Sequence, residues 1–143
     1  MIEPYDYDAA ISFAGEDREF ARYIADALAG RFRVFFDEFE KAELWGSDLT
    51  DTLPQKYIAS RYCVILQSNE YLEKAWTTLE RQAIIFEFLR RRGSDFVLPI
   101  RVGGCTKSIP GLSPVIAYLT VQSRGDWDEV ADLLAQKLSR SKG

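Results

Sequence analysis

The chain contains no histidine, and this absence narrows the chemistry that its side chains can perform. A Ser-His-Asp triad, a papain-like Cys-His pair and a histidine-based metal site are all excluded. Acid–base work near neutral pH would then fall to carboxylates, lysine, tyrosine or cysteine. Only two cysteines occur, and Cys63 lies inside an apolar run, which favours a buried thiol over a disulfide.

Glu80 is a candidate for the reactive carboxylate, and it lies four residues after Trp76. Both lie in a stretch from about Lys74 to Arg92 that we expect to be one long helix, closed by Gly93. Residues four apart share a helical face, so the indole could wall a site or stack on a ring while the carboxylate faces substrate. The structural alternative is that Trp76 is core and Glu80 pairs with a surface cation. The spacing alone favours that alternative.

The segment after the first expected strand offers contacts for a phosphate. Gly15 lets backbone approach a ligand, and the helix that follows presents free N–H groups. Glu16 and Asp17 would repel a phosphate unless they point away, and helix capping is their structural alternative. Arg18 either compensates these negative charges or binds the phosphate. Phe13, at the end of the strand, either stacks on a ligand ring or belongs to the core.

Three other segments have a functional and a structural interpretation. Asp37 and Glu38 end the second expected strand, where they form either the rim of a pocket or a solvated turn. Ser68 either donates to a sugar hydroxyl or caps its loop. The polar stretch 37–46 is interrupted by Leu44 and Trp45, and an exposed tryptophan there would be a candidate interface anchor. The alternative is that Trp45 packs back onto the next helix.

Strand and helix signals alternate along the chain, which predicts an α/β domain with a mostly parallel sheet. Five strands and their helices fit a flavodoxin-like doubly wound sheet in the order 2-1-3-4-5, with helices on both faces. Ligands bind such sheets beyond the carboxyl ends of the strands, near the switch point. We expect that crevice to be lined by residues 13–18, 37–47 and 67–70. The expected strands are residues 8–13, 33–36, 62–66, 96–100 and 116–121.

The length of 143 residues fits a single domain over 1–138, followed by a frayed tail at 139–143. The net charge of −4 argues against nucleic acid as a partner, and the cluster Arg90 to Arg92 is explained by the dipole at a helix end. No apolar run has membrane-spanning length, and the first residues do not resemble a signal peptide. We therefore expect a cytoplasmic protein that does not bind membranes.

Several segments, taken in order, resemble the conserved boxes of Toll/interleukin-receptor (TIR) domains, especially the plant and bacterial branches. Each segment alone is a weak signal, but the ordered set is specific and covers essentially the whole chain. The matching segments are Ser12 to Arg18, Phe35 to Glu38 with Gly46 further along, Tyr62 to Leu66 followed by Ser68 and Tyr71, Trp76 to Glu80, and Phe96 to Ile100.

The resemblance implies an NAD⁺ glycohydrolase or cyclase that releases nicotinamide and works in immune or antiphage signalling. It makes Glu80 the catalytic residue, and Thr77 stands where many members have a cysteine. NAD⁺ is then the substrate, and we expect no resident cofactor and no metal. The resemblance also implies assembly with other TIR domains, as a homo-oligomer or filament. The expected substrate-binding residues are Phe13, Ala14, Gly15, Arg18, Asp37, Trp45, Gly46, Ser68 and Trp76.

This chemistry suits a chain without histidine. Nicotinamide departs neutral, so no general acid is required, and one carboxylate can stabilise an oxocarbenium-like ribose. The alternative function is a non-catalytic scaffold that signals by TIR–TIR assembly, which Glu80 disfavours because scaffold members usually lack it. A flavodoxin-like FMN or phospho-acceptor domain fits less well, since the third strand ends in Gln67 and Ser68 without an acceptor aspartate.

Overall fold

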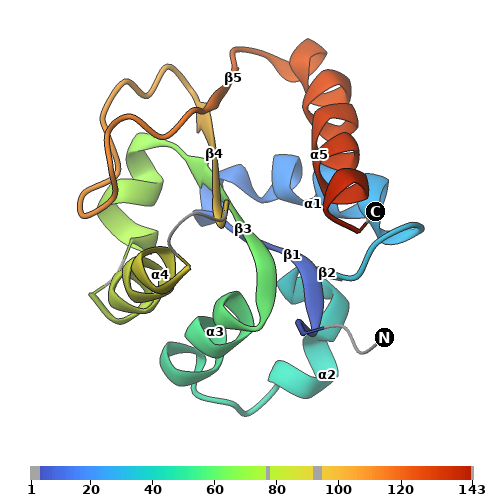
Figure 1. Ribbon diagram of the computed structural model, residues 1–143, viewed down its shortest axis with the longest axis vertical. Coiled ribbons are helices and arrows are strands. Elements are labelled where there is room, and N and C mark those ends of the chain that lie inside the picture. Colours follow the sequence, from blue (N-terminus) through green and yellow to red (C-terminus); the bar gives the residue numbers. More distant parts are fainter. Residues whose placement is uncertain (1–3, 77, 92–94, 143) are drawn as a thin grey trace.

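A five-stranded parallel sheet lies at the centre of the computed structural model, which describes residues 4–76, 78–91 and 95–142 (Figure 1). The order β2-β1-β3-β4-β5, with every neighbouring pair parallel, confirms the predicted topology. The strands are β1 (Tyr7–Ser12), β2 (Val34–Phe35), β3 (Ser60–Gln67), β4 (Val97–Val102) and β5 (Leu119–Val121).

Helices cover both faces of the sheet. In Figure 1, α1 (Arg18–Ala29) and α5 (Trp127–Lys142) lie together on one side. On the other side lie α3 (Leu49–Ile58) and α4 (Thr78–Arg90). Two layers of helix around one sheet are what right-handed crossovers produce in a doubly wound fold. The shorter elements are η1 (Gly15–Asp17), η2 (Asp37–Glu40), α2 (Lys41–Leu44), η3 (Tyr71–Ala75) and η4 (Arg124–Asp126).

The central strand β3 shows why this sheet is stable. Val64 and Leu66 belong to the apolar cluster that includes α1 and α5, whereas Cys63 and Ile65 belong to the cluster beneath α3 and α4. Side chains alternate between the faces of a strand, so a strand covered on both sides needs a continuous apolar run. The run in β3 predicted this burial, and Cys63 and Cys105 are indeed free, buried thiols.

The expected single helix from Lys74 to Arg92 was wrong. The wide-turned π-helix η3 ends at Ala75, Trp76 leaves helical geometry with φ −78° and ψ 66°, and α4 begins at Thr78. The spacing of apolar residues did not predict this break in the helix. A π turn inserts one extra residue into a helix and needs no change in residue types. The proposed end at Gly93 lies outside the described residues.

Helical segments form at three further places. The polar stretch 37–46 is mostly the short helices η2 and α2. Helix α5 continues to Lys142, so most of the tail expected to fray is helical. The segment η4 begins in a capping box in which Ser123 is the N-cap and Asp126 its partner. Within the described part of the chain, no helix is long and apolar enough to cross a membrane.

Candidate active site

A cavity of about 220 Å³ lies at the carboxyl end of β1, and we call it the inner cavity. In this strand order the chain leaves β1 for β2 on one side and returns to β3 on the other, so β1 lies at the switch point where such sheets bind ligands. The inner cavity brings together five residues expected from the sequence. These are Phe13, Gly15, Arg18, Asp37 and Glu80.

Glu80 reaches the inner cavity from the first turn of α4, where the helix dipole stabilises a carboxylate. It is partly buried. Burial raises the pKa of the Tyr57 hydroxyl and of the Cys63 thiol, and the negative charge of Glu80 raises both further. Both groups therefore stay protonated at neutral pH. A thiolate nucleophile is therefore not offered at Cys63.

Phe13 contributes an aromatic wall to the inner cavity. Its ring packs on Phe36 with centroids 5.7 Å apart, and the guanidinium carbon of Arg18 lies 4.9 Å from its centroid. Next to it, the buried Ser12 Oγ shares a 2.8 Å hydrogen bond with the Tyr71 hydroxyl. That bond joins the end of β1 to η3, so the wall and the turn before α4 are held together.

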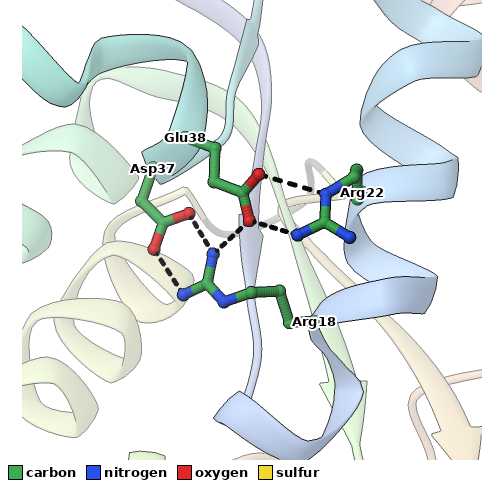
Figure 2. A network of polar contacts seen from close by, with 4 residues as sticks. All are labelled: Arg18, Arg22, Asp37 and Glu38. Carbon is green, nitrogen blue, oxygen red and sulfur yellow. Dashed lines mark hydrogen bonds and ion pairs between the residues drawn. The ribbon is translucent and has the colours of Figure 1, made fainter.

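Arg18 is the centre of a network of ion pairs between α1 and η2 (Figure 2). Its guanidinium donates two 2.9 Å hydrogen bonds to the carboxylate of Asp37, and a 2.7 Å bond to Glu38. Arg22, one turn later on α1, donates to the same Glu38 carboxylate. These bonds raise the pKa of Arg18 and lower the pKa of Glu38 to about 2, chiefly through Arg22 and then Arg18.

A second cavity of about 600 Å³, the outer cavity, adjoins the first. It shares Arg18, Asp37 and Leu53 with the inner cavity and is also lined by Trp45. Trp45 is 90% exposed, so the alternative that it packs back onto the next helix was wrong. Gly46 follows with φ +88°, a left-handed conformation that glycine adopts without strain, and it lines neither cavity.

Besides Gly46, three more of the expected substrate contacts lie outside both cavities. Trp76 is buried, and its indole N–H donates to the Pro110 carbonyl at 3.2 Å, as the structural interpretation expected. Ser68 is buried and its Oγ accepts from the backbone N–H of Tyr71, which is the capping role. Ala14 is buried at the N-cap of η1.

The two acidic residues before α1 do not cap that helix with their side chains. Asp17 occupies the N-cap position of α1 without a side-chain capping bond, and burial raises its pKa. Glu16 instead forms a 2.7 Å ion pair with Lys74, which lines the inner cavity. The negative charge of Glu16 is thus compensated by a paired cation.

Tyr57 and Lys74 line the inner cavity although sequence reasoning did not select them. Tyr57 fitted the apolar stripe of a helix, and Lys74 fitted the start of one. Only the packing of α3 and η3 beside the end of β1 gives these residues a place in the site. Within the described residues, no group of three or more histidine, cysteine or acidic side chains has an arrangement that could hold a metal ion.

Comparison with known proteins gives the chain its family. A TIR domain family model matches residues 10–136. A 3' cyclic ADP-D-ribose synthase, AaTIR, from Aquimarina amphilecti is 36% identical over 96% of this chain and 42% of its own length. An NAD(+) hydrolase, TcpA, from a Theionarchaea archaeon is 28% identical over 82% of this chain and 35% of its own. A 2' cyclic ADP-D-ribose synthase, AbTIR, from Acinetobacter baumannii is 30% identical over 66% of this chain and 35% of its own. The chain thus spans about two fifths of the length of these relatives or less.

Solved structures show the same fold at low sequence identity. A metazoan TIR-STING receptor from C. gigas superposes with a TM-score of 0.67 at 19% identity, over 92% of this chain and 40% of that one. The TIR domain of a Toll-related receptor from Hydra magnipapillata superposes with a TM-score of 0.65 at 13% identity, over 93% of this chain and 98% of that one. The family model covers most of the sequence, and one relative is 36% identical along nearly all of it. The chain therefore belongs to the TIR domain family.

Proposed function

We propose that this TIR domain cleaves the bond between nicotinamide and ribose in NAD⁺, with Glu80 as the catalytic carboxylate. The observation that carries the proposal is the position of Glu80 in the inner cavity at the switch point of the sheet. The names of the three curated relatives support it, since one is an NAD(+) hydrolase and two are cyclic ADP-D-ribose synthases.

The reaction breaks the bond from the ribose C1' to the pyridinium nitrogen. The electron pair of that bond stays with nitrogen, so nicotinamide leaves neutral and positive charge develops on the ribose. The carboxylate of Glu80 stabilises that charge across the inner cavity. A water molecule then adds at C1' and loses its proton to give ADP-ribose. A nucleophile from the substrate's own ADP-ribose half would instead give a cyclic isomer.

The decisive experiment compares the wild-type domain with Glu80→Gln, which keeps the side-chain shape and removes the charge. Concentrated protein is incubated with NAD⁺, and nicotinamide is measured by chromatography. We expect release by the wild type and a loss of at least about 10²-fold in the variant, since one stabilising group is worth that much. The midpoint of thermal unfolding, measured in parallel, should change little. Equal rates would refute the role of Glu80. No release by either protein would favour the scaffold alternative.

The wider setting is part of the same proposal. Both cysteines are free and buried, which fits a reducing compartment, so we place the activity in the cytoplasm. An ADP-ribose isomer could act as a diffusible signal, which fits a role in immune or antiphage signalling. We further propose that the domain assembles with other TIR domains, because Trp45 leaves a large apolar surface exposed beside the site.

A further inference from the structure

The inner and outer cavities meet at one ion pair. Arg18 and Asp37 line both cavities, and their side chains are joined by two 2.9 Å hydrogen bonds. A ligand that places one end beside Glu80 and the other in the outer cavity must therefore pass the Arg18–Asp37 pair. NAD⁺ has that form, because two nucleosides are joined through a diphosphate. If the nicotinamide ribose binds at Glu80, the diphosphate falls at the junction of the cavities, where Arg18 and Asp37 lie.

We propose that Arg18 binds the substrate diphosphate and that Asp37 competes with the diphosphate for it, so that binding exchanges one anionic partner of the guanidinium for another. This inference rests on the proposed function. A guanidinium forms the same two parallel hydrogen bonds with phosphate oxygens as with a carboxylate. The present partner of Arg18 is thus a carboxylate in the geometry that a phosphate would take.

The surroundings of the pair permit such an exchange. The side chains of Arg18 and Asp37 are 38% and 34% exposed, so the released carboxylate can turn into water instead of being left buried and unpaired. Arg18 itself is held from other directions, by Glu38 and by the ring of Phe13. It can therefore keep its place while Asp37 leaves.

The second arginine explains why Glu38 does not repel the incoming phosphate as strongly as Asp37 would. The carboxylate of Glu38 is bonded to Arg22 through both oxygens, so its charge stays compensated (Figure 2). Asp37 shows no comparable second arginine among the bonds drawn in Figure 2. Asp37 is therefore the carboxylate that competes with the phosphate for Arg18. The result is selection for a substrate that carries a phosphate group at this point, because such an anion can replace the carboxylate on Arg18.

The test measures binding of ADP-ribose by calorimetry, without catalysis, to the wild type and four variants. Arg18→Gln should weaken binding by about tenfold or more, as expected for lost charge-assisted bonds. Arg18→Lys should retain part of the affinity, since it keeps the charge and loses the paired geometry. Asp37→Asn should tighten binding by about threefold or more, because the competing charge is gone. The matched control is Arg22→Gln, which removes a cation of the same network that lines neither cavity and should weaken binding clearly less than Arg18→Gln, because it reduces only the compensation of Glu38.

The inference would be overturned if Arg18→Gln bound ADP-ribose like the wild type, or if Asp37→Asn bound it more weakly. Equal weakening by Arg18→Gln and Arg22→Gln would also overturn it, since the network would then act only by holding α1 against η2. Circular dichroism of each variant confirms folding. Failure of the proposed function is distinguishable, because wild-type protein would then release no nicotinamide whether or not ADP-ribose binding depends on Arg18.

Discussion

At the scale of single residues, Trp76 and Glu80 show how one local bend separates two side chains that sequence spacing joins. Four residues of α-helix would have put both on one face. The chain instead leaves helical geometry at Trp76, before α4 begins. The indole enters the apolar cluster beneath α3 and α4, while the carboxylate lines the inner cavity. Their different positions predict different consequences of mutation.

Trp76→Phe should lower the free energy of unfolding, because it removes the hydrogen bond to the Pro110 carbonyl and leaves space in the core. We expect a loss of about 1–3 kcal/mol, measured by urea denaturation. The KM for NAD⁺ should stay within about twofold of wild type, since Trp76 lines neither cavity. A large rise in KM without loss of stability would show that the indole contacts substrate after all.

At the scale of elements, α4 carries Glu80 at its start and is fastened to the rest of the domain near its end. Glu87 accepts a 2.9 Å bond from Arg91, and both residues are buried. The guanidinium of Arg91 also donates to the carbonyls of Ile58, Ser60 and Arg61, at the end of α3 and the start of β3. The expected explanation of these arginines by the helix dipole missed this tertiary role.

Arg91→Met should destabilise the domain by about 3–5 kcal/mol, because it leaves the buried carboxylate of Glu87 with fewer partners and three carbonyls without this donor. The matched control is Arg90→Met. Arg90 bonds to the same carboxylate, but its side chain is 55% exposed and we expect a change below about 1 kcal/mol. Both values come from chemical denaturation at neutral pH. Similar losses in the two variants would contradict the role assigned to Arg91.

The same carboxylate makes stability depend on pH on the acid side. Hydrogen bonds from Arg90 and then Arg91 hold the pKa of Glu87 below its ordinary value of 4.5 despite burial. A lowered pKa stabilises the folded state above pH 4.5, and that contribution is lost as pH falls through the lowered value. Glu87→Gln should therefore lose less stability than wild type between pH 5 and pH 3, measured by thermal midpoints. If the thermal midpoint fell equally in both proteins, other carboxylates would account for the loss of stability at low pH.

At the scale of the whole molecule, the inner cavity lies at the carboxyl end of β1 and the outer cavity adjoins it. Catalysis is most effective where water is excluded and groups are held in place. The exposed Trp45 lines the outer cavity, and a neighbouring TIR domain that packs on Trp45 would exclude water from the site. Self-association would then couple assembly to activity.

We therefore predict that the specific rate of nicotinamide release rises with protein concentration or with crowding. Trp45→Ala should remove that rise while the monomer stays folded by circular dichroism. Phe86→Ala is the matched control, because Phe86 is another exposed aromatic side chain, on α4 and outside the cavities, and its loss should preserve the rise. A dilute monomer with full and constant specific activity would show that the segment 37–46 acts without a partner.

The sequence by itself determined the class and order of the sheet, because this information is local and repetitive. The apolar run from Tyr62 to Leu66 marks a strand covered on both faces, and alternation with helices leaves few topologies once crossovers are right-handed. Arg18 and Asp37 could be selected as candidate site residues because they follow expected strands, whereas Glu80 was selected through the resemblance to TIR domains. The structure brings all three to one cavity.

Only the tertiary structure decided what each of these side chains faces. The π turn before α4, which separates Trp76 from Glu80, is joined to β1 by the hydrogen bond between Ser12 and Tyr71, 59 positions apart. The pairing of Arg18 with Asp37 and the burial of Arg91 depend likewise on segments distant in sequence. A charged side chain takes the partner that packing places within reach, and the spacing of residues along the chain does not contain that distance.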